Sequence, residues 1–97
     1  MEIITLSGVV NGRCVKRQTK RGTEYLIFKV SCEKKKHDGK LEYTVYRCTC
    51  FNLEFETLKE GDIVFLTGNL QISVTTDDGG KTCVNRDVFI MTIDSGK

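Results

Sequence analysis

The residues that could do chemistry in this chain are cations gathered in one stretch of the sequence. Between Arg13 and Lys40 there are ten lysines and arginines and only three acids, whereas the remainder of the chain is net acidic. The ten cations are Arg13, Lys16, Arg17, Lys20, Arg21, Lys29, Lys34, Lys35, Lys36 and Lys40. The net charge of the whole chain, +2, hides this segregation. A dense basic stretch on a folded framework indicates a polyanion as partner, and the backbone of a nucleic acid is the commonest one.

The carboxylates, by contrast, do not form an arrangement that is typical of catalysis. Asp77 and Asp78 lie in a predicted turn, and Glu54 and Glu56 lie on the surface of a predicted helix. Neither pair is accompanied by a histidine or a hydroxyl nucleophile in a recognisable arrangement, and the sequence has no glycine-rich loop of the P-loop type. We therefore expect no enzyme activity, no cofactor and no small-molecule substrate.

The five cysteines lack the spacing of a disulfide framework. They are Cys14, Cys32, Cys48, Cys50 and Cys83. A zinc site needs four convergent ligands, and the one histidine, His37, lies in a polar loop. We expect buried, reduced thiols without a bound metal and a cytoplasmic location; a metal or disulfide role is the alternative.

The length of 97 residues predicts a single domain, residues 1–97, with a modest core. There is no run of about 18 apolar residues, so we expect no membrane segment. The start of the chain, residues 1–6, lacks the basic and apolar regions of a signal peptide. The protein is therefore expected to work in the compartment where it is made.

The elements that would position the basic stretch are strands, because apolar residues recur at every second position. In Leu26–Cys32 the residues Leu26, Phe28, Val30 and Cys32 share one face. Other strands are predicted from about Ile3 through Val10 and on toward Arg17, from Leu41 to Phe51, from Ile63 to Val74 and from Thr82 to Ile93. Turns are predicted near residues 20–22, 35–40 and 76–81.

One short helix is predicted over residues 52–59, with Asn52 as its N-cap and Gly61 as its stop. Five strands with a short helix between the third and the fourth favour an all-β fold, the five-stranded OB-fold barrel. A β-sandwich, which needs about seven strands, is the alternative.

The outward face of the second and third strands would bring rings and cations together. Its members are Tyr25, Lys29, Tyr43, Arg47 and Phe51. The flanking hairpin adds Lys34, Lys35, Lys36 and Lys40, and the preceding turn adds Lys16, Arg17, Lys20 and Arg21. Such a face suits a single-stranded nucleic acid, which offers phosphates to the cations and exposed bases to the rings.

Each of these residues also has a structural interpretation. Tyr25 and Tyr43 are alternatively packing partners of each other across the two strands. Phe51 alternatively packs beneath the helix, and the hairpin lysines alternatively form an ordinary solvated loop. Ile63 and Phe65 face away from the barrel interior, and we expect them to form a contact between subunits rather than to bind DNA.

Residues Leu58–Leu70 resemble the bacterial single-stranded DNA-binding protein family, in which a Lys-Gly-Asp type corner precedes a strand of the form V-x-x-x-G-x-L. Supporting matches are Leu6–Val10, Gly22 before Phe28–Val30, and Asp78–Lys81, so the similarity runs from about Ile3 to Ile93. The resemblance implies non-catalytic binding of single-stranded DNA in replication, recombination or repair. It also implies a homodimer or homotetramer, paired through the first strand, and replication proteins as further partners.

The sequence departs from the family pattern in its stacking residues. Three tryptophans of well-known members correspond to Lys34 or Lys35, Val45 and Thr75, and the chain has no tryptophan. Phe51 and Arg47 match an aromatic and a basic position, whereas the acidic C-terminal tail of the family is not found. We therefore expect charge to contribute more of the affinity than stacking does.

A shorter relative, the primosomal replication protein N family, has a similar size and a similar ending at Ile93–Gly96. It suggests an alternative function, an adaptor that docks on a replication enzyme and binds single strands weakly. An RNA-binding protein of the same architecture is a third interpretation.

Overall fold

The computed structural model describes residues 2–95 and consists of strands with one short 3-10 helix. In chain order the elements are β1 (Glu2–Gln18), β2 (Glu24–Lys35), β3 (Leu41–Cys50), η1 (Leu53–Thr57), β4 (Ile63–Thr76) and β5 (Thr82–Ser95). The start at Met1 and the Gly96 end of the primosomal-type ending lie outside the described residues. Within residues 2–95, no helix is long and apolar enough to cross a membrane.

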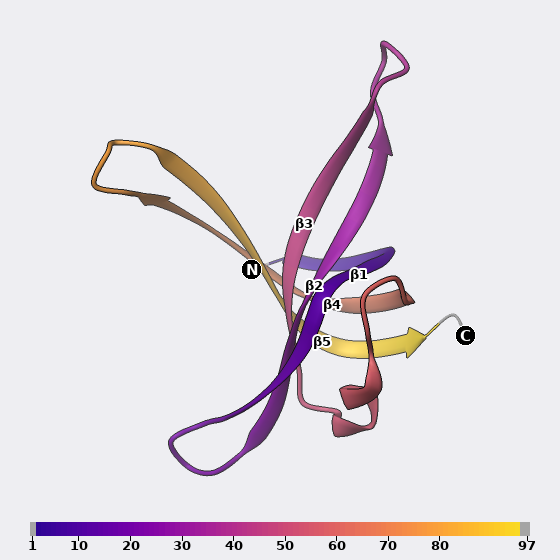
Figure 1. The fold of residues 1–97 in the computed structure, drawn as a ribbon, viewed down its shortest axis with the longest axis vertical. Coiled ribbons are helices and arrows are strands. Elements are labelled where there is room, and N and C mark those ends of the chain that lie inside the picture. Colours follow the sequence, from indigo (N-terminus) through magenta and orange to yellow (C-terminus); the bar gives the residue numbers. More distant parts are fainter. Residues whose placement is uncertain (1, 96–97) are drawn as a thin grey trace.

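The five strands close into a barrel in the order β1-β2-β3-β5-β4 (Figure 1). β1 closes two sides of it, because its first half pairs with β4 and its second half pairs with β2. The change of partner, at Val9, is followed by a register shift between Asn11 and Val15, where Gly12 has a φ of 84°. All neighbouring strands are antiparallel except β3 and β5, which are parallel. The prediction of a five-stranded OB-fold barrel is confirmed.

The barrel interior is filled by the alternate residues that the sequence pattern selects. The buried core consists of Val10, Leu26, Phe28, Val30, Cys48, Cys50, Leu58, Val64, Leu66 and Val88. Because side chains alternate along a strand, burying this set leaves the intervening residues of β2 and β3 on the outer face. The shared face predicted for Leu26, Phe28, Val30 and Cys32 is therefore confirmed, with Cys32 and Tyr46 half-buried at the edge of the core.

Gly68 lies where β4 comes closest to β5. A Cβ atom at this position would be 2.5 Å from the carbonyl oxygen of Phe89 and 2.7 Å from Cγ1 of Val88. A register shift between Thr67 and Gly68 occurs at the same point. The backbones of β4 and β5 thus approach each other closely at this glycine.

The predicted helix over residues 52–59 is shorter than expected. The N-cap is confirmed, since the side chain of Asn52 accepts a hydrogen bond of 3.0 Å from the backbone N–H of Glu54. The helix is a five-residue 3-10 helix that ends at Thr57, because Leu58 takes an extended conformation and enters the core. Gly61, with a φ of 95°, ends the following turn rather than the helix. The prediction that this segment ends at Gly61 is therefore wrong.

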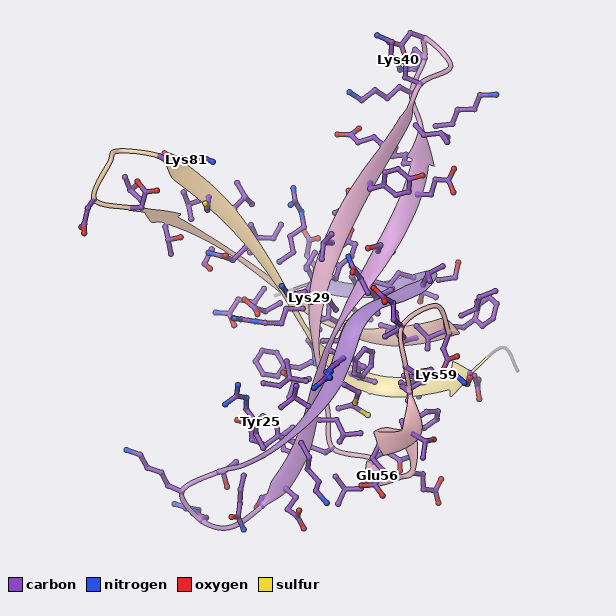
Figure 2. The ribbon with its side chains drawn as sticks, viewed as in Figure 1. Tyr25, Lys29, Lys40, Glu56, Lys59 and Lys81 are labelled. Carbon is purple, nitrogen blue, oxygen red and sulfur yellow. The ribbon has the colours of Figure 1, made fainter. Side chains whose placement is uncertain are left out.

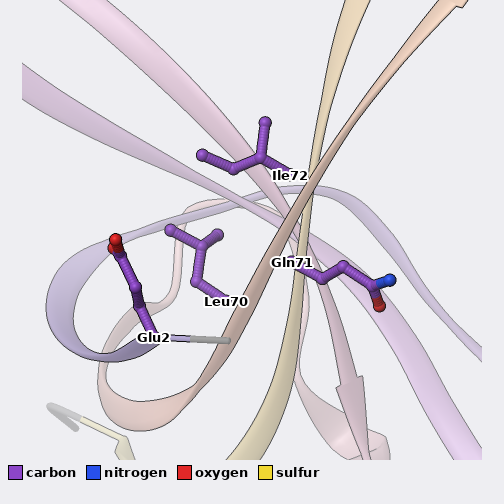
Figure 3. Close-up of a pocket in the computed structure, with 4 residues that line it drawn as sticks. All are labelled: Glu2, Leu70, Gln71 and Ile72. Carbon is purple, nitrogen blue, oxygen red and sulfur yellow. The ribbon is translucent and has the colours of Figure 1, made fainter.

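Three hairpins extend from the barrel as arms (Figure 1). We call residues 17–25 the β1–β2 arm, residues 33–43 the β2–β3 arm and residues 71–86 the β4–β5 arm. At the base of the β4–β5 arm, Leu70 and Ile72 point to the side of Glu2, and Gln71 points to the opposite side of β4 (Figure 3). The side of Ile72 also carries Val74, Val84 and Arg86, whereas the side of Gln71 continues the outer surface of the barrel.

The cysteines are all free thiols, and their burial differs. Cys48 and Cys50 are buried, Cys14 and Cys32 are half-buried, and Cys83 is exposed on β5. Burial raises the pKa of the Cys48 thiol to about 12. The expectation of buried thiols is therefore wrong for Cys83, which lies on the β4–β5 arm where no core covers it.

Candidate nucleic-acid interface

One row of polar side chains crosses the outer face of four strands. The register pairs Lys29 of β2 with Arg47 of β3, Arg47 with Asp87 of β5, and Asp87 with Gln71 of β4. Paired residues point to the same side of a sheet, with Cβ atoms about 4.5–5.5 Å apart in an antiparallel pair. The structure therefore brings Lys29 and Arg47, both predicted from the sequence, into direct proximity.

Arg47 is oriented by an acid that the sequence reasoning did not select. Its Nε donates a hydrogen bond of 2.5 Å to Oδ1 of Asp87. The Arg47 side chain is 60% exposed and that of Asp87 is 22% exposed. The bond uses one of the five N–H groups of the guanidinium, so the remaining ones can still bind a phosphate.

A groove of about 610 Å³ lies beside this ion pair, which we call the central groove. Side chains of β2, β3, β4 and β5, and of the residue that follows β3, line it, among them Tyr25, Ile27, Arg47, Phe51, Gln71, Asp87 and Phe89. The rings of Tyr25 and Phe51 are in contact, with centroids 5.7 Å apart and planes tilted by 44°. Phe51 is 54% exposed, so it does not pack beneath η1 as the alternative interpretation supposed.

A second, smaller hollow of about 290 Å³ continues the central groove toward the β4–β5 arm. It is lined by Lys29, Val45 and residues 84–86 together with Arg47 and Asp87, which line both hollows. The Arg47–Asp87 pair therefore lies at the junction of one continuous surface depression, with the aromatic residues on one side and Lys29 on the other.

Comparison with known proteins identifies the family. The model of the single-strand binding protein family matches residues 1–95. The chain belongs to this family. A search of curated proteins gives no significant match.

Solved structures of other single-stranded DNA-binding proteins share the fold of this family member. The small protein from Streptomyces coelicolor has a TM-score of 0.71 at 18% identity, covering 97% of this chain and 93% of its own. The Plasmodium falciparum protein in complex with single-stranded DNA has a TM-score of 0.72 at 13% identity, covering 100% and 96%. Yeast mitochondrial Rim1 has a TM-score of 0.68 at 13% identity, covering 99% and 95%.

In this family member the hairpin lysines lie apart from the central groove. Lys34, Lys35 and Lys36 are exposed near the tip of the β2–β3 arm, with Lys40 at the tip, whereas Lys29 lies where the arms meet (Figure 2). Tyr43 also lies on this arm, where it is exposed and pairs with Glu33. The alternative interpretation of Tyr25 and Tyr43 as packing partners is wrong, because Tyr25 lies beside Phe51 and Tyr43 pairs with Glu33.

The cations of the first turn separate onto two sides of the barrel. Arg17 pairs with Tyr25 and so shares the side of the central groove, and Lys20 and Arg21 lie in the turn of the β1–β2 arm. Lys16 pairs with Leu26 and points to the opposite side, where its Nζ lies 3.5 Å from Glu24 and 3.6 Å from Glu56. These two carboxylates, Glu24 first, raise the pKa of Lys16. The structure thus does not bring Lys16 to the central groove.

Asp87, Phe89 and Gln71 are among the groove residues that were not predicted from the sequence. The signal for two of them was present, because an inward Val88 places its neighbours Asp87 and Phe89 outward. The parallel contact of β3 with β5, which brings them to Arg47 and Thr49, has no local signature in the sequence.

Proposed function

We propose that this chain binds single-stranded DNA, without catalysis, along the central groove and the β2–β3 arm. The observation that carries the proposal is the juxtaposition of Arg47 and the Tyr25–Phe51 ring pair in the central groove with Lys29 in the adjoining hollow. Membership of the single-strand binding protein family and the fold shared with a protein solved in complex with single-stranded DNA support it.

In this proposal the charges attract the DNA backbone and the rings hold the bases. Stacking of one base on an aromatic side chain is worth roughly 1–3 kcal/mol, and phosphate contacts add a salt-dependent term. The binding residues we propose are Arg17, Lys20, Arg21, Tyr25, Lys29, Lys34, Lys35, Lys36, Lys40, Tyr43, Arg47 and Phe51. Lys16 is left out because Glu24 and Glu56 engage it on the other side of the barrel.

The proposal includes a homodimer or homotetramer. The outer face of β1 and β4 exposes an apolar patch of Ile3, Val9, Ile63 and Phe65, in which Val9 pairs with Ile63. A patch of this kind is typical of a surface that another subunit covers. The whole chain, residues 1–97, would then act as one binding domain in each subunit, in the cytoplasm, during DNA replication, recombination or repair.

A titration of labelled oligo-dT, matched duplex and matched RNA at several salt concentrations tests the proposal. We expect oligo-dT to bind more tightly than duplex, with affinity that falls as salt rises. Duplex binding equal to that of oligo-dT, or no oligo-dT binding at low salt, would contradict it. Tighter binding of RNA would favour the RNA-binding alternative, and weak DNA binding together with capture of a replication enzyme would favour the adaptor.

A further inference from the structure

The carboxylate of Asp87 is an unexpected group at the centre of a surface proposed to bind a polyanion. It lines both hollows of the depression, and one of its oxygens, Oδ1, already accepts the Nε–H of Arg47. An ionised carboxylate can accept about four hydrogen bonds and donate none. Asp87 therefore keeps acceptor capacity in a position that Arg47 holds fixed.

This placement constrains how a single strand can lie in the central groove. A phosphate on the Asp87 side of Arg47 would be repelled, so the backbone is expected to follow the Lys29 side of Arg47 and the lysines of the β2–β3 arm. The bases are then directed toward the floor of the groove, between Asp87 and the rings. Phe51 and Phe89, both about half exposed, offer the apolar surfaces against which a base can stack.

We propose that Asp87 discriminates between bases in the groove by accepting a hydrogen bond from an exocyclic amino group, and so favours cytosine over thymine. The inference rests on the proposed binding of single-stranded DNA. Cytosine presents its N4 amino group as a donor, which an aspartate or glutamate accepts. Thymine presents the O4 acceptor at the corresponding position, which a carboxylate oxygen repels.

The test compares the Kd of oligo-dT with that of an oligonucleotide of 5-methylcytosine, each about 15 nucleotides long to cover one barrel. The two bases share the methyl group and differ along the edge that carries O4 or N4. For the Asp87→Asn variant we expect the affinity ratio to shift toward thymine by about fivefold or more, because an amide can donate to O4. The control Asp78→Asn, which removes the same charge in the exposed turn of the β4–β5 arm, should leave the ratio unchanged.

A second measurement uses the wild-type protein, so it does not depend on the folding of a variant. An oligonucleotide of N4,N4-dimethylcytosine lacks the amino donor and should bind more weakly than one of unmodified cytosine, from which it differs at N4 alone. An equal affinity for these two, or an unchanged ratio in a folded Asp87→Asn variant, overturns the role of Asp87 and leaves single-strand binding intact. No binding of any oligonucleotide overturns both the role of Asp87 and the proposed function.

Discussion

Lys29 and Arg47 occupy paired positions on β2 and β3, so two like charges stand side by side on the outer face of the barrel. Like charges that lie directly opposite each other in a sheet destabilise it. Asp87 relieves this repulsion from the Arg47 side, and no acid is bonded to Lys29 among the interactions within residues 2–95. A bound phosphate would reduce the repulsion that remains between Lys29 and Arg47. We therefore expect this pair to be stabilised by a bound polyanion.

Replacing Lys29 by alanine should weaken oligo-dT binding and reduce its salt dependence. Each phosphate contact that is lost lowers the slope of log K against log salt by about 0.7 for a single strand. Lys59→Ala is the matched control, since Lys59 lies near η1, away from the central groove (Figure 2). The binding constants are measured by fluorescence anisotropy at several salt concentrations. Equal slopes of log K against log salt for the two variants would show that Lys29 does not contact a phosphate.

Replacing Phe51 by alanine should weaken oligo-dT binding by about 1–3 kcal/mol, because it removes one face of the Tyr25–Phe51 pair. The loss should persist at high salt, unlike that of a lysine variant. Phe65→Leu on the outer face of β4 is the comparison, with both proteins checked by circular dichroism. An unchanged Kd in a folded Phe51→Ala protein would show that the rings pack and do not stack on bases.

The neighbours Lys16 and Arg17 should respond differently to substitution. Arg17 shares the side of Tyr25, whereas Lys16 is engaged by Glu24 and Glu56 on the opposite side. We expect Arg17→Ala to weaken oligo-dT binding and Lys16→Ala to leave it near the wild-type value. If the two variants lose affinity equally, general charge attraction rather than a defined path explains the contribution of this segment.

Gly68→Ala should destabilise the fold more than Gly80→Ala. A Cβ atom at Gly68 meets backbone and core atoms at 2.5 and 2.7 Å, and forcing such contacts costs about 1–3 kcal/mol. Gly80 has a φ of 79° but open space around it, so its substitution costs about 1 kcal/mol of backbone strain. Urea unfolding of both variants measures the difference, and a smaller loss for Gly68→Ala would contradict the packing argument.

Stability should fall at alkaline pH through the buried thiol of Cys48. Its pKa is raised in the folded state from 9.0 to about 12, so above pH 9 the unfolded chain releases a proton that the folded chain retains. The free energy of unfolding then decreases by about 1.4 kcal/mol per pH unit between pH 9 and 12. Cys48→Ala should lack this component, so the measurement is the difference between the two urea-unfolding curves over that range. A constant difference would show that this thiol does not contribute.

The β-strands and the core were predictable because their signal is local. Alternation alone assigns Leu26, Phe28 and Val30 to the interior and leaves Lys29 outside. The length of η1 was not predictable in the same way, because the burial of Leu58, a tertiary interaction, ends the helix early.

The candidate site was predictable in its β2 and β3 members and not in its β5 members. Tyr25, Lys29, Arg47 and Phe51 belong to one hairpin, whose register follows from its turn. Asp87 and Arg47 meet because the barrel closes between β3 and β5. The two residues are 40 positions apart in the sequence, so the periodicity of either strand does not predict their contact. Alternation along β1 already places Lys16 and Arg17 on opposite sides, whereas the contact of Lys16 with Glu56 near η1 depends on the tertiary fold.

The parallel contact between β3 and β5 has a consequence for the mechanics of the barrel. Its register comprises three residue pairs, Arg47 with Asp87, Cys48 with Val88 and Thr49 with Phe89, fewer than any other neighbouring pair of strands in residues 2–95. The first and last of these pairs are also groove residues. A ligand in the groove would therefore contact both strands of the pair with the fewest ladder partners, where we expect local opening to begin. Because a ligand that binds only the closed barrel stabilises it, amide exchange at β3 and β5 should slow by a factor of 1 + [L]/Kd, where [L] is the free ligand concentration.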